Sequence, residues 1–111
     1  MNNNQPKIRT ISCRPDDEGD VVATLVSHAP ASSTQRAVLY IHGFVDYYFH
    51  DHVAERFTQA GYAFHALDLR KYGRSLRSHQ RPNFCADIRE YNEEITSALE
   101  MIADEGSNDI T

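Results

Sequence analysis

One short segment constrains the fold of this chain more than any other. Residues Ala37–Ile41 (AVLYI) are consecutively apolar, and His42, Gly43 and Phe44 follow directly. A continuous apolar run bounded by turn-forming segments is typical of a strand buried on both faces, as in a parallel sheet covered by helices. We therefore expect a buried strand over Arg36–Ile41 that ends in a turn at His42-Gly43-Phe44.

Around this segment, the pattern alternates strands with a helix. The β-branched-rich runs Lys7–Cys13 and Asp20–His28 are separated by a cluster of turn formers, which predicts an antiparallel hairpin. Apolar residues at three- and four-residue steps over His50–Ala60, with Gly61 after them, predict a short helix. A strand over Tyr62–Leu69 would complete one β-α-β unit with the apolar segment.

A longer helix is predicted in the last third of the chain. Asn83 would be its N-cap and Gly106 its end, because apolar residues recur between them every three or four positions on one side. These apolar residues are Phe84, Ile88, Tyr91, Ile95, Leu99 and Ile102. The opposite side is acidic, which we interpret as a solvated face rather than a binding site. The acidic residues are Asp87, Glu90, Glu94 and Glu100. After Gly106 the alternating pattern predicts the start of another strand.

Length and charge limit the possible functions. With 111 residues, the chain is about half as long as the roughly 200 to 250 residues of many α/β enzymes, so we expect a partial domain over residues 7–111 after a polar tail of residues 1–6. A formal charge of -5 without a basic block argues against nucleic acid and anionic membranes as partners. The sequence contains no run long enough for a membrane span and no secretory signal at its start, so a cytoplasmic location is expected.

The two cysteines, Cys13 and Cys85, are far apart and outside any C-x-x-C spacing, which makes a disulfide framework or a zinc site improbable. We interpret Cys85 as a small buried side chain on a helix rather than as a catalytic thiol. His50-Asp51-His52 could suggest a metal site, but at the start of a helix the two imidazoles point apart, and further ligands are missing. The Asp51 charge favours a helix N-terminus instead.

A second motif follows the predicted β-α-β unit and makes the interpretation specific. Residues 67–75 read LDLRKYGRS, and together with His42-Gly43-Phe44 they resemble the α/β-hydrolase superfamily, whose members carry a D-x-R-G-x-G-x-S loop. The matching residues are Asp68, Arg70, Gly73 and Ser75. Lys71 stands where the family usually has glycine, which leaves open whether this loop has the usual backbone conformation.

The resemblance implies an α/β fold: the amino-terminal part of a three-layer sandwich, with an antiparallel hairpin followed by parallel strands and crossover helices. It is closest to the esterase, lysophospholipase and monoacylglycerol-lipase branch, which hydrolyses carboxylic esters without a cofactor. By position, Phe44 would supply the backbone N–H of an oxyanion hole, and Gly43 would allow the tight turn. His42 would anchor this loop by a hydrogen bond to the backbone rather than act as a base.

The 111 residues contain no G-x-S-x-G nucleophile motif, and the family order of Ser, Asp or Glu, and His implies that the triad follows Thr111. Ser75 is not a candidate nucleophile, because nothing around it resembles the strained G-x-S-x-G elbow between a strand and a helix, and the resemblance implies a mainly structural role for Asp68, Arg70 and Ser75. We therefore expect an amino-terminal fragment of a serine hydrolase that is inactive by itself. The alternative is a non-catalytic interaction or regulatory module, whereas a dinucleotide-binding domain lacks its G-x-G-x-x-G motif.

Two further expectations remain open on the sequence alone. Tyr47, Tyr48 and Phe49, with Phe44, could line a pocket for a small ester or acyl substrate or could simply pack the loop. The sheet order of the family would leave one edge of the Ala37–Ile41 strand without its fifth-strand partner. An apolar strand edge is a template for pairing with another chain, so self-association is expected.

Overall fold

The computed structural model of the chain describes residues 6–30, 36–42, 51–107 and 109–111. The strands are β1 (Lys7–Asp16), β2 (Gly19–His28), β3 (Arg36–Ile41), β4 (Ala63–Asp68) and β5 (Asp109–Ile110). The helices are α1 (Asp51–Gln59) and α2 (Asn92–Asp104), and the short 3-10 turns are η1 (Gly73–Ser75) and η2 (Ile88–Tyr91). No helix among these described residues is long and apolar enough to cross a membrane.

The strands form one mixed sheet in the order β1-β2-β4-β3-β5. β2 is antiparallel to both β1 and β4, whereas β3 runs parallel to β4 and β5. The predicted hairpin and β-α-β unit are both confirmed. The hairpin strands are longer than expected, so that Asp17 and Glu18 alone form the tip, and Gly19 has a positive φ of 110° that favours glycine.

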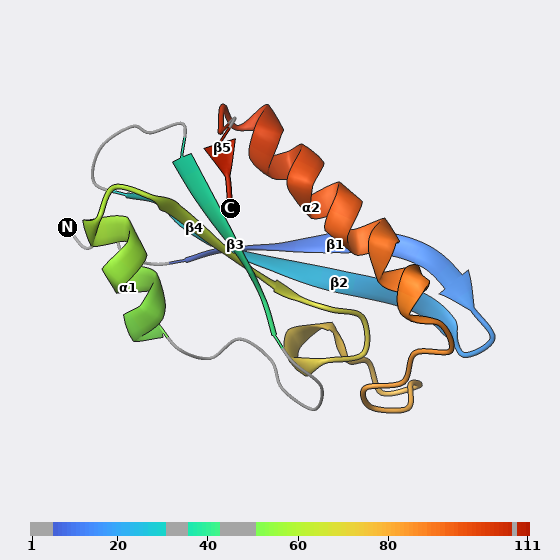
Figure 1. Cartoon of the computed structure of the whole chain (residues 1–111). Helices are drawn as coiled ribbons and strands as arrows, with labels where there is room; N and C mark the ends of the chain where they lie inside the picture. Colours follow the sequence, from blue (N-terminus) through green and yellow to red (C-terminus); the bar gives the residue numbers. More distant parts are fainter. Residues whose placement is uncertain (1–5, 31–35, 43–50, 108) are drawn as a thin grey trace.

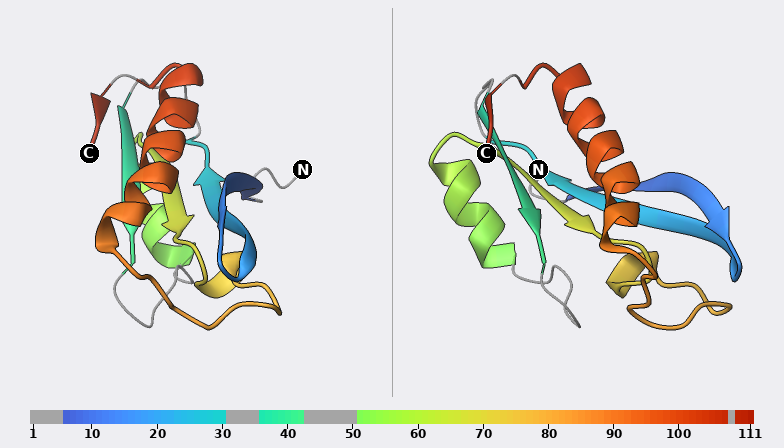
Figure 2. Two further views of the ribbon diagram at one scale, coloured as in Figure 1. Left: turned by 90° about the vertical axis from the view of Figure 1, so that its right-hand side faces the viewer. Right: turned by 45° about the vertical axis from the view of Figure 1, so that its right-hand side comes forward.

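Two apolar clusters give the molecule three layers. Leu25, Leu67 and Ile102 belong to the cluster between the sheet and α2, whereas Phe64 and Ala54 belong to the cluster between the other face and α1. The two helices therefore cover opposite faces of the sheet (Figures 1 and 2). α1 ends just before Gly61, whose φ of 92° confirms the predicted left-handed C-terminal turn.

The last helix begins later than the sequence predicts. α2 starts at Asn92, and Asp87 caps the preceding turn η2 by accepting a hydrogen bond from the Arg89 N–H. Asn83 is not a helix cap, because it lies in a loop with a φ of 60°. Ile88, expected on the buried side, is 78% exposed. The predicted end is correct: Gly106 follows α2 with a φ of 101°.

β3 is less buried than a central strand of a covered sheet. Ala37 is fully buried, but the next three residues are half-buried and Ile41 is 40% exposed. β5 pairs with the first two residues of this strand, Arg36 and Ala37. The edge expected to be open is thus covered along its first part: the N–H of Thr111 donates to the carbonyl of Ala37, and the Leu39 N–H donates to the carbonyl of Thr111, both at 2.9 Å.

His65 on β4 is a buried titratable group that should make the fold sensitive to acid. It is 4% exposed, and its Nδ1 lies 2.8 Å from the Ser27 hydroxyl on β2. Arg9 donates to the same hydroxyl at 3.0 Å and pairs with Glu105. Burial lowers the pKa of His65 from 6.5 to about 4. In the unfolded chain the imidazole is exposed and regains its ordinary pKa.

We expect the free energy of unfolding to decrease as the pH falls from 6.5 to about 4, because the unfolded chain binds a proton at His65 there and the folded chain does not. The shift corresponds to about 3 kcal/mol in total. Urea titrations at several pH values would measure it, with His65→Gln expected to flatten this part of the profile and exposed His52→Gln expected to leave it unchanged. A parallel loss of stability in wild type and His65→Gln would assign the acid sensitivity to other groups.

Candidate active site

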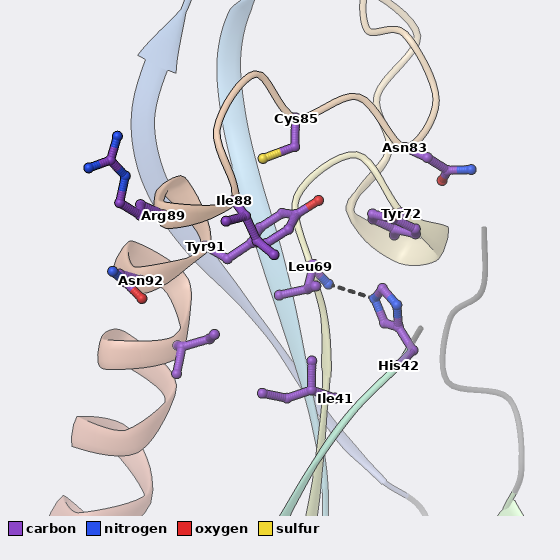
Figure 3. Close-up of a pocket in the computed structure, with 11 residues that line it drawn as sticks. Ile41, His42, Leu69, Tyr72, Asn83, Cys85, Ile88, Arg89, Tyr91 and Asn92 are labelled. Atoms are coloured by element: carbon purple, nitrogen blue, oxygen red, sulfur yellow. Dashed lines mark hydrogen bonds between the residues drawn. The ribbon is translucent and has the colours of Figure 1, made fainter. Parts of the chain in front are cut away.

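A cleft opens at the carboxyl ends of β3 and β4. In open α/β sheets, this end of the strands is where ligands bind. The cleft has a volume of about 630 Å³. Figure 3 shows His42 and Tyr72 on one side of it, Ile88 and Tyr91 on the other, and Leu69 between them. The remaining lining residues are Ile41, Asn83, Cys85, Arg89, Asn92 and Ile95. Most of this lining is apolar or aromatic, which suits an acyl or aromatic group.

His42 is the predicted site residue that the structure describes. It is 6% exposed, and its Nε2 accepts a hydrogen bond from the Leu69 N–H at 3.1 Å (Figure 3). Its ring also packs at 4.5 Å from the ring of Tyr72. Because Nε2 accepts, a neutral His42 carries its proton on Nδ1. The side chain thus joins the start of the loop after β3 to the end of β4, which fits an anchor better than a general base.

The loop after β4 is built by its own polar residues. Asp68 is fully buried, and its carboxylate accepts hydrogen bonds from the backbone and side chain of Arg74 at 3.1 and 2.9 Å. The buried Ser75 hydroxyl donates to the Asp68 carbonyl at 2.6 Å and lies 3.1 Å from Thr24 Oγ1. Ser75 is therefore committed to holding the loop, as expected for this motif, and is not exposed for attack on a substrate.

Lys71 adopts the backbone conformation that glycine would favour at this position. Its φ is 65°, in the left-handed region where a Cβ is unfavourable. The side chain is 1% exposed, and its ammonium pairs with Asp16 at 2.6 Å and with Glu18 at 2.7 Å. Burial alone would lower the pKa of Lys71, but the hydrogen bonds to the two carboxylates outweigh it and raise the pKa. The replacement of glycine therefore keeps the turn and adds a contact to the hairpin tip.

Arg70 and Glu94 form a buried ion pair between the loop after β4 and α2. The side chain of Glu94 is completely buried, and that of Arg70 is 5% exposed. The Arg70 backbone N–H donates to Glu94 Oε2 at 2.8 Å, and Nη2 donates to Oε1 at 2.7 Å. Burial alone would lower the pKa of Arg70, but the bonds to Glu94 raise it. The expectation that Glu94 lies on a solvated face was wrong, because this pair fixes α2 to the loop.

Neither cysteine has the environment of a catalytic thiol. Cys85 is half-buried and lines the cleft, but it lies in a loop, not on the helix expected from the sequence. Burial raises its pKa. Burial also raises the pKa of Cys13 to about 11, and nearby Glu94 adds to the effect. A catalytic cysteine needs a lowered pKa, and both thiols have a raised one.

Several predicted residues lie outside the described part of the chain. These are Gly43 and Phe44 of the oxyanion loop, the aromatic residues Tyr47, Tyr48 and Phe49, and His50. His52 is exposed at the start of α1. Within the described ranges no group of three or more His, Cys, Asp or Glu residues is placed to hold a metal ion.

Comparisons with known proteins agree with this arrangement. The profile of the family described as Serine aminopeptidase, S33 matches residues 32–109. A structure of DcsB in complex with its substrate analogue is 20% identical, with a TM-score of 0.67 over 95% of this chain and 36% of the other. A soluble variant of monoglyceride lipase from Saccharomyces cerevisiae, in complex with a substrate analog, is 18% identical, with a TM-score of 0.63 over 91% and 32%. No curated protein matches the sequence.

The family profile and the fold together identify the chain as a partial α/β-hydrolase fold. The chain belongs to the Serine aminopeptidase, S33 family of hydrolases, whose profile matches most of its length. It spans about a third of the length of these two structural neighbours, 36% of DcsB and 32% of the monoglyceride lipase. At these identities the two structures support the fold alone.

Two features of the cleft were not found from the sequence. The lining residues Ile88, Tyr91 and Ile95 were assigned to a single helix, although the first two belong to the 3-10 turn η2 and Ile95 belongs to α2. The role of Lys71 was also missed, and its signal was a lysine at a position that favours glycine. A non-glycine residue at this positive φ is strained, and its side chain must make contacts that offset the strain if it is buried. Lys71 makes such a contact with Asp16.

Proposed function

We propose that this chain is the amino-terminal part of a serine hydrolase of carboxylic esters, and that it supplies the oxyanion side of the active site. The Phe44 backbone N–H would be one oxyanion donor, and His42 and Gly43 would set the loop that presents it. The observation that carries the proposal is the buried His42, whose Nε2 is bonded to the Leu69 N–H at the mouth of an apolar cleft.

The chemistry needs residues that this sequence does not contain. An ester carbonyl in the cleft would develop negative charge on its oxygen when a serine attacks it, and a fixed N–H beside that oxygen can contribute ~3 kcal/mol to stabilising the transition state. The cleft can supply a mainly apolar surface beside His42. Attack requires a nucleophile and base, and the 111 residues contain no G-x-S-x-G motif.

The 111-residue chain should therefore show no hydrolysis of a short-chain p-nitrophenyl ester and no labelling by a fluorophosphonate probe. A longer version that includes the sequence encoded after the Thr111 codon should be labelled on one serine beyond residue 111 and should hydrolyse the ester. Labelling of Ser75, or of any serine within the 111 residues, would contradict the proposal. A non-catalytic module would be supported instead if the reading frame continues past the Thr111 codon without a nucleophile motif, or if it does not continue.

We also propose that the 111-residue chain self-associates along β3. In the described part of the chain, β5 pairs with the first half of this strand, while the apolar Ile41 at its end is 40% exposed. Size-exclusion chromatography with light scattering should show dimers or larger species, and Ile41→Lys should shift them toward monomer. A monodisperse wild-type monomer would contradict this proposal without affecting the proposed chemistry.

A further inference from the structure

The tip of the β1–β2 hairpin lies far in sequence from the cleft residues Asn83 and Cys85, but it contacts the segment that contains them. In Figure 1 the hairpin extends past the other strands, and the segment between η1 and α2 returns beside it. Three residues of this segment contact the hairpin: Arg81 Nε donates to Glu18 at the tip at 2.6 Å, and the side chains of His79 and Gln80 each lie 2.9 Å from the Asp20 carbonyl at the start of β2.

Lys71 occupies the centre of this contact. Its ammonium is held between the Asp16 and Glu18 carboxylates and lies 5.0 Å from the centre of the Phe84 ring. Arg81 covers the same ring at 3.7 Å. The Lys71 carbonyl accepts a hydrogen bond from the Asn83 N–H at 2.8 Å. Both the backbone and the side chain of Lys71 therefore hold residues 81–84 in place.

These held residues lead directly into the cleft. Asn83 and Cys85 line it, and so does Tyr72, the neighbour of Lys71 that packs against His42. We propose that Lys71 is a positioning residue, which is held by Asp16 and Glu18 of the hairpin and in turn fixes residues 81–85, including the cleft residues Asn83 and Cys85. The inference rests on the proposed function in so far as the cleft is the active site, but its geometry does not depend on hydrolysis.

The energetics favour such a role over incidental packing. A non-glycine residue with a φ of 65° is under backbone strain, and a nearly fully buried ammonium loses its hydration. The ion pairs of the ammonium with the Asp16 and Glu18 carboxylates and its contact with the Phe84 ring offset this strain and this loss of hydration. Removing the ammonium would leave Asp16 and Glu18 without this shared partner at the tip. The bond from the Asn83 N–H to the Lys71 carbonyl and the contacts of His79, Gln80 and Arg81 with the hairpin would remain.

The rate at which Cys85 is alkylated depends on how well residues 81–85 are held in place, and it can be measured in the 111-residue chain. Alkylation by iodoacetamide, followed by peptide mass spectrometry, gives separate rates for Cys85 and for Cys13 on β1. We expect Lys71→Gly, which suits the left-handed backbone but removes the ammonium, to raise the Cys85 rate roughly five-fold or more with little change at Cys13. Lys71→Arg, which keeps a cation, should restore most of the protection.

A second variant removes the same ion pairs by changing the two hairpin carboxylates instead of Lys71. Asp16→Asn combined with Glu18→Gln leaves Lys71 in place but removes the charges that hold it, and should also raise the Cys85 rate selectively. An unchanged Cys85 rate in both variants would overturn the proposal, and so would equal increases at Cys85 and Cys13, which indicate general loosening. Because the assay does not use ester hydrolysis, its failure is distinct from a failure of the proposed function.

Discussion

Replacing Glu94 with alanine should lower the free energy of unfolding by about 3 to 5 kcal/mol, because it leaves the Arg70 charge buried without its main partner. The Glu94 carboxylate accepts from the backbone N–H, Nε and Nη2 of Arg70. This loss is comparable with much of the total stability of a small domain, which is roughly 5 to 15 kcal/mol. Urea or thermal unfolding followed by circular dichroism would measure it.

Two acidic residues on the same helix provide matched controls. Glu100 is exposed, so Glu100→Ala should change the stability by no more than about 0.5 kcal/mol. Glu93 also pairs with Arg70, at 2.9 Å, but its side chain is 25% exposed, and Glu93→Ala should cost about 1 kcal/mol or less. Equal effects of the Glu94 and Glu100 substitutions would show that the buried pair does not stabilise the fold.

The sequence predicted those elements whose pattern depends on near neighbours. The hairpin, the β-α-β unit and the end of α1 at Gly61 follow from apolar periodicity and turn residues, and all are present. The D-x-R loop was recognised by its resemblance to the family motif, and its residues do bond to one another within a few positions, as Ser75 does to the Asp68 carbonyl. Local patterns of this kind determine local structure directly.

Contacts between distant residues account for the errors. The spacing of Phe84 and Ile88 suits a helix, but Phe84 lies against the Lys71 and Arg81 cations, and the Asn83 N–H is bonded to the Lys71 carbonyl. Glu94 sits among other acidic positions of an amphipathic helix, and its partner Arg70 is 24 residues away in the sequence. Tertiary pairing overrides the helical pattern in both cases, and no local rule reveals it.

Phe44→Pro should reduce kcat by on the order of 100-fold or more in a longer version that hydrolyses esters, because proline lacks the backbone N–H proposed as the oxyanion donor. Phe44→Ala keeps this N–H and removes only the ring, so its kcat should stay within a few-fold of wild type. The two variants together separate a backbone role from a side-chain role. Circular dichroism would confirm that both are folded before their kinetics are compared.

The direct test of the proposed oxyanion loop is therefore the ratio of kcat for Phe44→Ala to kcat for Phe44→Pro, measured with one p-nitrophenyl ester at saturating concentration. A donor at the Phe44 N–H predicts a ratio on the order of 100. A ratio near one, with both variants folded, would contradict the assignment of this chain to the oxyanion side of a serine hydrolase site.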